Sequence, residues 1–232
     1  MMNDNEIIRD FFMSRLERDG KSEGLLDYTT GIRYYYQDFD VRSRKFANFL
    51  TDKAKIKKGD RVAICAGNCV QHIDMFYAIV RTGYIMTSYN VKLTERELSE
   101  LILKENPSVV LYEEEFGEKA AALKKRFPEV AFISTGNKKQ EGDLACYQEV
   151  LEYSDEDRSL PDHQFEDIAM LVHTGGTTGI PKAAMISYRA LYYNVINQVT
   201  AYGVNNRDVV YVCLPLFHAA AWNSLLMPLL YV

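Results

Sequence analysis

Apolar and polar positions alternate with two different periods along this chain, and the two periods together predict a mixed α/β fold. Apolar residues recur at helical spacing over residues 5–18 and again over residues 38–55. The intervening residues 25–36 read as two short strands on either side of Thr30-Gly31, which indicates a hairpin that turns there. We therefore expect the chain to begin with a helix, a hairpin and a second helix.

After residue 60, short apolar runs take turns with amphipathic stretches. Thr94 and Glu97 have the spacing of a capping box, for a helix that ends before Pro107. This alternation is typical of a mostly parallel sheet covered by helices. Residues 153–167 are acidic, polar and contain proline, so we expect a surface connection there. The expected strands cover residues 61–66, 84–89, 108–112, 130–134, 168–172, 183–186 and 209–214, and the other expected helices cover 70–81, 118–126 and 187–202.

Size and charge limit the class of protein. The 232 residues are 47% hydrophobic, enough to bury one substantial core, and nothing indicates a second independent domain. A formal charge of −5 argues against a nucleic-acid-binding surface. The amino-terminal residues lack the apolar segment of a signal peptide, and no apolar run is long enough to cross a bilayer. A cytoplasmic location is therefore expected.

The cysteines and histidines do not form a metal-binding pattern. Three residues separate Cys65 from Cys69, but no second cysteine pair accompanies them closely, so no metal site is expected. Cys65 and Cys213 lie in apolar, strand-like runs. We expect both to be free, buried thiols.

The most informative stretch runs from His173 to Lys182 and reads HTGGTTGIPK. Its glycines let the backbone approach a ligand closely, and successive N–H groups in such turns converge on an anion. The threonine hydroxyls and Lys182 add short donors and a positive charge suited to terminal phosphates. Apolar runs on both sides indicate a strand, a loop and a strand. The predicted polyphosphate site comprises Thr174, Gly175, Gly176, Thr177, Thr178, Gly179 and Lys182.

Other interpretations of this loop fit less well. A Walker A loop needs a serine or threonine after its lysine, whereas Ala183 follows Lys182. A dinucleotide fingerprint opens a helix, whereas residues 183–186 are short, apolar and strand-like. An ordinary glycine-rich hairpin is the remaining alternative, although a hairpin needs only one or two glycines and no lysine. In that case Lys182 is a solvent-exposed strand lysine.

The loop resembles the phosphate-binding signature of the adenylate-forming, or AMP-binding, enzymes, whose usual form is Tyr-Thr-Ser-Gly-Thr-Thr-Gly-x-Pro-Lys-Gly. Here His173 replaces the tyrosine, Gly175 the serine and Ala183 the last glycine. The form Thr-Gly-Gly-Thr-Thr-Gly is similar to that of fatty acyl-CoA ligases. Three further segments resemble the family in the same order, so the resemblance covers the chain from about Leu25 onward. They are residues 58–64, 81–98 and 214–218, the last of which reads Leu-Pro-Leu-Phe-His.

The resemblance implies the fold of the N-terminal domain of an acyl-CoA synthetase. Residues 1–232 are then the N-terminal part of an AMP-binding domain, and the rest of that domain and a small C-terminal domain are absent. The implied activity is that of a long-chain fatty acid CoA ligase-like enzyme, a ligase of fatty acid metabolism. Such an enzyme uses ATP and Mg²⁺ to convert a fatty or aryl acid to an acyl-adenylate, and transfers the acyl group to coenzyme A. The fragment alone is expected to be inactive or nearly so.

The same resemblance implies roles for individual residues. Residues 174–179 and Lys182 would contact the β- and γ-phosphates and the departing pyrophosphate. Lys182 and His218 are the candidate catalytic residues. His218, Trp222 and Asn223 would line the acid pocket, although His218 also fits a partly buried helix cap and Trp222 also fits the core.

Two other functions remain open. One is an adenylation domain that loads the thiol of a carrier protein, because carrier proteins and coenzyme A present the same phosphopantetheine thiol. The other is a truncated nucleotide-binding protein without catalysis. The acyl chain length and the choice between a fatty and an aryl acid are left undetermined by these residues.

Overall fold

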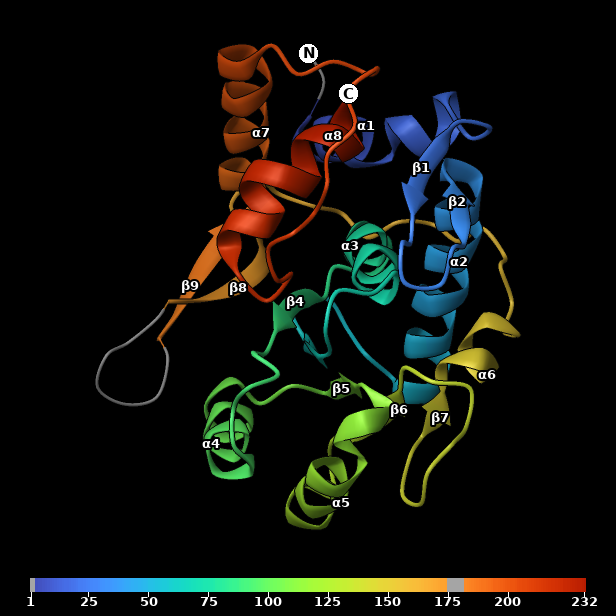
Figure 1. Cartoon of the computed structure of the whole chain (residues 1–232), viewed down its shortest axis with the longest axis vertical. Coiled ribbons are helices and arrows are strands. Elements are labelled where there is room, and N and C mark those ends of the chain that lie inside the picture. The colour runs from blue at the N-terminus through green and yellow to red at the C-terminus, as the bar shows by residue number, and fades with distance from the viewer. Residues whose placement is uncertain (1–2, 175–181) are drawn as a thin grey trace.

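The computed structural model describes residues 3–174 and 182–232, and its main feature is a seven-stranded sheet (Figure 1). The strand order is β7-β6-β5-β3-β4-β8-β9. Neighbouring strands are parallel except β8 and β9, which pair antiparallel. This confirms the predicted mostly parallel sheet. The strands are β3 (Arg61–Cys65), β4 (Ile85–Ser88), β5 (Val109–Tyr112), β6 (Ala131–Ser134), β7 (Ala145–Cys146), β8 (Ile168–Thr174) and β9 (Lys182–Ser187).

Helices cover both faces of this sheet, because its strands alternate apolar side chains between the two faces. In β3, Val62 and Ile64 join the larger core, whereas Ala63 and Cys65 join the smaller one. The larger core packs against α1, α2, α3, α7 and α8, and the smaller core against α4 and α5. The helices are α1 (Asp4–Arg18), α2 (Tyr36–Phe49), α3 (Gln71–Thr82), α4 (Glu95–Glu105), α5 (Gly117–Arg126), α6 (Tyr147–Leu151), α7 (Tyr188–Tyr202) and α8 (Met227–Tyr231).

Shorter elements complete the fold. The predicted amino-terminal hairpin is confirmed as β1 (Glu23–Leu26) and β2 (Arg33–Tyr35), which pair antiparallel in a sheet of their own. A π-helical turn, η1 (Leu50–Ala54), extends α2, and another, η3 (Ala221–Leu226), precedes α8. A 3₁₀ turn, η2 (Glu114–Phe116), leads into α5. None of the described helices combines the length and apolar character needed to cross a membrane.

The predicted capping box at the start of α4 is confirmed. The backbone N–H of Thr94 donates to the carboxylate of Glu97 at 2.8 Å, and the backbone N–H of Glu97 donates to the Thr94 hydroxyl at 3.3 Å. These contacts satisfy backbone donors that the first helical turn leaves without partners. They fix where α4 begins, and the helix ends at Glu105, before Pro107 as predicted.

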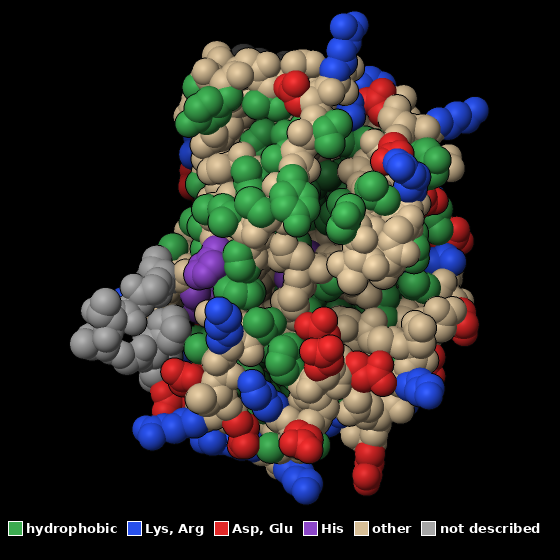
Figure 2. Space-filling view, in the orientation of Figure 1, with side chains coloured by type: hydrophobic (Ala, Val, Ile, Leu, Met, Phe, Trp, Pro, Cys, Tyr) green, Lys and Arg blue, Asp and Glu red, His purple; other side chains and the backbone are tan. Residues whose placement is uncertain are grey.

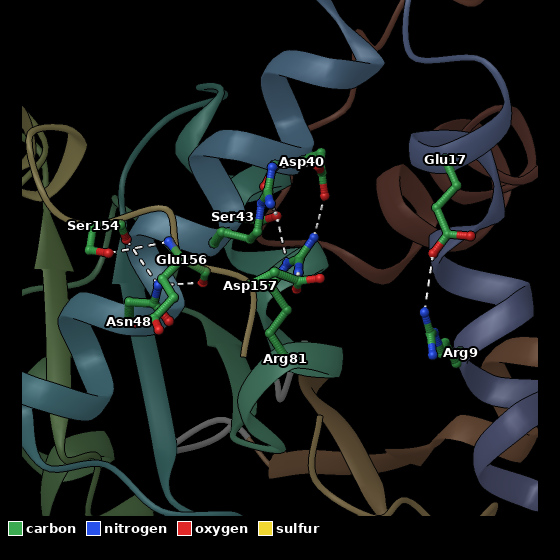
Figure 3. Close-up of polar contacts among 10 residues, drawn as sticks. Arg9, Glu17, Asp40, Ser43, Asn48, Arg81, Ser154, Glu156 and Asp157 are labelled. Carbon is green, nitrogen blue, oxygen red and sulfur yellow. Dashed lines mark hydrogen bonds and ion pairs between the residues drawn. The ribbon is translucent and has the colours of Figure 1, made fainter. Parts of the chain in front are cut away.

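Buried charges in the helical layer are paired with several donors. Arg42 on α2 donates two hydrogen bonds to Asp74 on α3, at 2.9 and 2.7 Å, and the hydroxyl of Tyr147 donates a third at 2.6 Å. Asp74 is fully buried, and these donors offset the cost of removing its charge from water. Nearby, Arg81 contacts Asp40 between the same two helices (Figure 3).

The connection between α6 and β8, residues 153–167, forms no helix or strand, and its acidic part is exposed as predicted. It is nevertheless fixed to the helices. The side-chain amide of Asn48 donates to the carbonyls of Ser154 and Glu156, both at 2.9 Å (Figure 3). His163 is only 1% exposed, and its Nε2 lies 2.8 Å from a backbone carbonyl of α3. The connection is therefore partly a component of the core and not only a surface link.

The strand predicted at residues 209–214 is wrong. The segment forms neither strand nor helix, and Val209 is 96% exposed. A strand needs a neighbouring backbone along its length. Here the side-chain amide of Asn68 contacts the segment instead, donating to the carbonyls of Val212 at 3.3 Å and Leu214 at 3.0 Å.

Candidate functional site

The carboxyl ends of three neighbouring strands meet at one edge of the sheet. β3, β4 and β8 lie side by side and run parallel, so the residues that follow them share this edge. Open α/β sheets bind ligands outside the carboxyl ends of their strands. Asn68 lies shortly after β3, Tyr89 follows β4, and β8 ends at His173 and Thr174. The candidate site is built from this edge.

The predicted phosphate loop joins β8 to β9. His173 pairs with Ala183 and Thr174 pairs with Lys182, so the antiparallel ladder holds the two ends of the loop together. Lys182 is exposed at the start of β9. The predicted strand–loop–strand arrangement is confirmed for its two strands. Five of the candidate phosphate ligands lie outside the described residues: Gly175, Gly176, Thr177, Thr178 and Gly179.

The imidazole of His173 connects β8 to two other elements. Its Nδ1 lies 3.2 Å from the backbone carbonyl oxygen of Ser88 on β4, and its Nε2 lies 2.6 Å from Oε1 of Glu105 on α4. A carbonyl oxygen only accepts, so Nδ1 carries a proton and donates it. The short contact to the carboxyl group holds one proton between Nε2 and Oε1. The residue that precedes Thr174 is therefore fixed through both ring nitrogens.

Glu105 occupies a place that local rules disfavour. It is the last residue of α4 and only 9% exposed, and the carboxyl end of a helix carries partial negative charge. Its partners include the imidazole of His173 and the hydroxyl of Thr87, whose Oγ1 lies 3.3 Å from Oε2. Arg61 donates to the backbone carbonyl of Glu105 at 2.8 Å and offsets the charge of the helix end. A buried carboxylate in this position depends on such partners.

A second group of contacts forms at the carboxyl end of β3. While the amide of Asn68 donates to the segment that follows α7, its Oδ1 accepts a hydrogen bond of 2.8 Å from the backbone N–H of Leu216. One side chain therefore replaces a strand ladder for residues 212–216. This fixes the turn that carries the candidate residue His218 next to the end of β3.

The residues predicted to line the acid pocket differ in exposure. His218 is exposed. Trp222 is 2% exposed, its Nε1 donates to the carbonyl of Leu216 at 2.6 Å, and its ring centroid lies 5.5 Å from that of Phe76. The core position considered for Trp222 is thus the one observed, and the residue supports the turn from below. Asn223 is partly buried and accepts, through its backbone carbonyl, a hydrogen bond of 2.9 Å from a side chain of α7.

One cysteine–histidine contact lies close to this edge, but it is not a nucleophilic pair. The Sγ atom of Cys69 lies 3.3 Å from Nδ1 of His72. Burial raises the pKa of Cys69 to about 12 and lowers the pKa of His72 to about 4. A nucleophilic thiol needs the opposite shifts. Cys65 is free and buried as predicted; the predicted burial of Cys213 is wrong, because no sheet covers its segment.

Sequence reasoning did not identify Asn68 and Glu105, although both carry the geometry of the site. Asn68 had one usable signal, since it comes shortly after a buried strand that belongs to a parallel sheet. Glu105 also had one, because an acidic residue at the end of a helix, just before Pro107, contradicts the usual preference for cations there. A residue that breaks a local rule is a candidate for a functional position.

Comparisons with known proteins agree with this geometry. The family model described as AMP-binding enzyme matches residues 15–231. The chain is 25% identical to a medium-chain-fatty-acid–CoA ligase of Ectopseudomonas oleovorans, over 97% of this chain and 43% of that protein. It is 26% identical to a 2-succinylbenzoate–CoA ligase of Oceanobacillus iheyensis, over 89% of this chain and 39% of that protein. The chain thus spans less than half the length of these curated relatives.

Solved structures share the fold. An anthranilate CoA ligase in complex with anthranoyl-AMP superposes with a TM-score of 0.89 at 18% identity, over 97% of this chain and 43% of that one. ATP-bound MatB from Rhodopseudomonas palustris gives a TM-score of 0.81 at 23% identity, over 96% of this chain and 42% of that one. The arrangement of strands and helices is therefore that of the N-terminal domain of these enzymes.

Proposed function

Because this chain belongs to the AMP-binding enzyme family, we propose that it is the N-terminal part of an ATP-dependent, AMP-forming acyl-CoA synthetase. The observation that carries the proposal is the β8–β9 hairpin. Its two strands pair at Thr174 and Lys182, so the two ends of the segment rich in glycine and threonine lie at the carboxyl end of β8, in the same sheet as the parallel strands β3 and β4. Its substrate would be a fatty or aryl carboxylic acid, as in the relatives named for medium-chain fatty acids, 2-succinylbenzoate and ferulate.

The proposed reaction has two steps. The carboxylate of the acid attacks the α-phosphorus of ATP, a bond forms between oxygen and phosphorus, and pyrophosphate leaves with its bonding electrons. The thiol of coenzyme A then attacks the carbonyl carbon of the acyl-adenylate, and AMP leaves. In the first step two anions approach each other while charge grows on pyrophosphate. Donors that are fixed in advance lower this barrier electrostatically.

The hairpin would supply those donors. The hydroxyls and N–H groups of residues 174–179 and the ammonium of Lys182 would hold the β- and γ-phosphates. The ladder between β8 and β9 fixes where the loop starts and ends, and so holds Thr174 and Lys182 near each other. Mg²⁺ bound to ATP would neutralise part of the phosphate charge. Among the residues that the structure describes, no three His, Cys, Asp or Glu side chains gather into a metal site.

The acid would bind on the β3 side of the same edge. Asn68 fixes the turn at Leu216, and Trp222 supports that turn from the core. His218 is exposed on this turn and would donate a hydrogen bond to the acid carboxylate, with Asn223 lining the same pocket. In this arrangement the acid and the phosphates approach each other across neighbouring strand ends.

Residues 1–232 would form part of one domain, and residues outside this chain would complete the adenine and ribose contacts and the transfer of the acyl group. The proposal therefore concerns the full-length protein that carries this chain. The chain alone would not complete the reaction.

The test is acid-dependent exchange of labelled pyrophosphate into ATP by the full-length protein, over a panel of fatty and aryl acids. Exchange that requires an acid supports adenylation. Formation of an acyl-CoA thioester from the active acid then supports the complete proposal, whereas acylation of a carrier protein only would replace coenzyme A by a carrier as acceptor. Binding of ATP without exchange for any acid would leave a non-catalytic nucleotide-binding protein.

A further inference from the structure

We infer that Glu105 and His173 form a positioning pair, through which the end of α4 fixes the end of β8, where the phosphate-binding loop begins, and so affects nucleotide affinity. The inference rests on the proposed function, because it gives that loop a phosphate ligand. Glu105 acts through His173 and not on the nucleotide itself. Both residues, and all the contacts that carry the inference, belong to the described part of the chain.

The first argument is the length of the ladder between β4 and β8. It pairs Met86 with Met170 and Thr87 with Leu171, and it does not extend to His173. Backbone pairing with the sheet interior therefore ends before the loop begins. Beyond this point the side chain of His173 connects β8 to β4, because its Nδ1 lies 3.2 Å from the carbonyl of Ser88, the last residue of β4.

The second argument is the number of polar partners around the imidazole. One partner is the backbone carbonyl of Ser88, and the other is Oε1 of Glu105 at 2.6 Å from Nε2. Imidazole presents two nitrogens on opposite sides of a rigid ring and reaches both partners at once. The histidine at position 173 thus matches the carboxylate at position 105.

The third argument is the environment of Glu105. Its side chain is 5% exposed and that of His173 is 11% exposed, so water is largely excluded from the contact. A buried carboxylate that loses a partner tends to move toward water or toward another donor. Since His173 leads directly into the loop, such a movement would displace the strand end that carries the phosphate ligands. The pair should therefore influence the phosphate side of the reaction more than the acid side.

The experiment uses the full-length protein, four single variants of the pair, one double variant and one control. Glu105→Met and His173→Phe each break the contact with little change of volume, whereas Glu105→Gln and His173→Gln keep a hydrogen-bonding group at each position. The matched control is Tyr147→Phe, which removes one donor from the buried carboxylate of Asp74; Tyr147 follows β7, at the opposite edge of the sheet from β9. Calorimetry gives the dissociation constant of MgATP, exchange kinetics give the KM of the acid, and thermal melts show that each variant is folded.

We expect Glu105→Met and His173→Phe each to weaken MgATP binding roughly tenfold, the size of one charge-assisted hydrogen bond, with the KM of the acid changed less than about twofold. The glutamine variants should recover most of this loss. The double variant Glu105→Met/His173→Phe should be no weaker than the worse single variant, because either change already breaks the link. Tyr147→Phe should leave MgATP binding unchanged.

Several results would overturn the inference. These are unchanged MgATP affinity in both breaking variants, equal effects on ATP and acid, multiplicative losses in the double variant, or the same loss in Tyr147→Phe. If Glu105→Met does not fold, the comparison of His173→Phe with His173→Gln decides. Failure of the proposed function looks different, since the wild type would then bind MgATP without acid-dependent exchange. In that case the dissociation constants of the variants would still test the role of the pair. A wild type that does not bind MgATP would overturn both the proposed function and the inference.

Discussion

Two regions of this molecule use polar residues in opposite ways. In the closed region, residues 36–151, buried charges have several donors, as Asp74 has from Arg42 and Tyr147. In the open region, residues 168–174 and 182–220, Lys182 and His218 are exposed beside uncovered apolar side chains. Figure 2 shows charged side chains gathered over α4 and α5, and hydrophobic ones over the carboxyl-terminal segments. The exposed apolar residues include Met185 at 71%, Val209 at 96% and Tyr211 at 77%.

This difference separates two kinds of effect. In the closed region a polar substitution should change the free energy of unfolding, because its partners are buried and fully engaged. In the open region a polar substitution should change the binding or the reaction of the nucleotide or the acid, and should change the free energy of unfolding less. Glu105 belongs to the closed region and His173 to the open one. We therefore expect this pair to affect both the stability of the fold and nucleotide binding.

The largest expected effect belongs to the closed region. Arg42→Met should lower the free energy of unfolding by about 3–5 kcal/mol, because it leaves the buried carboxylate of Asp74 without its cation. Urea unfolding of the chain measures the change. Arg158→Met is the control, since Arg158 pairs with Asp52 near the surface and its loss should cost less than about 1 kcal/mol. Equal losses in the two variants would contradict the stabilising role given to the buried pair of Arg42 and Asp74.

The second prediction concerns the contact between α3 and η3, where the ring centroids of His72 and Trp222 are 6.4 Å apart. Burial lowers the pKa of His72 from 6.5 to about 4. As pH falls from 6.5 toward 4, the unfolded chain binds a proton that the folded chain does not, so the free energy of unfolding decreases by up to about 3 kcal/mol. Above pH 6.5 this loss is absent. His72→Leu should remove that part of the pH dependence.

Unfolding free energies of wild type and His72→Leu at several pH values between 4.5 and 7.5 check this expectation. The difference between the two proteins should grow in favour of the variant as pH falls. At pH 7 the variant should be about as stable as the wild type, since Nε2 of His72 is a buried nitrogen without a hydrogen-bond partner among the described residues. Parallel pH curves would show that His72 takes up its proton without unfolding.

Much of the closed region could be predicted from the sequence because its elements are long enough to show a period. The helix that starts at Thr94 and strand β3 are examples, since each combines a regular apolar pattern with a clear boundary. The two-residue strand β7 and the five-residue helix α6 were not predicted, because both are too short to show a period. Residues 209–214 have the apolar composition of a strand but no neighbouring backbone, and composition does not reveal a partner.

The candidate site divides in the same way. The hairpin around Lys182 could be predicted from local residue types. Glycines, threonines and a lysine can bind an anion through groups that are visible in the sequence itself. Glu105 contacts His173, which is 68 positions away in the chain, and Asn68 contacts Leu216, which is 148 positions away. Such contacts depend on the strand order, in which β3, β4 and β8 become neighbours. The strands on either side of the candidate phosphate loop could be predicted from the sequence, whereas the residues that hold the end of β8 in place could not.

The third prediction tests the open region. Lys182→Ala in the full-length protein should slow acid-dependent pyrophosphate exchange about 100-fold, because it removes a fixed charge from the departing pyrophosphate. The KM of the acid should change less than about threefold, and the melting temperature should stay nearly constant. Lys138→Ala, an exposed lysine of the closed region, serves as the control. Unchanged exchange would remove the phosphate role of Lys182, and a large loss of stability would place it with the closed region.

The smallest global effect is expected for Asn68→Ala, although it alters the turn beneath His218. Asn68 is exposed, so losing its contacts should cost only about 1 kcal/mol of unfolding free energy. Locally, the backbone N–H of Leu216 loses its acceptor and should exchange with solvent at least about tenfold faster. The N–H of Leu144, which donates to the carbonyl of Phe132 at 2.8 Å in the closed region, should keep its rate. Faster exchange at both amides would mean that Asn68 stabilises the whole fold, and that the two regions are less independent than their contacts indicate.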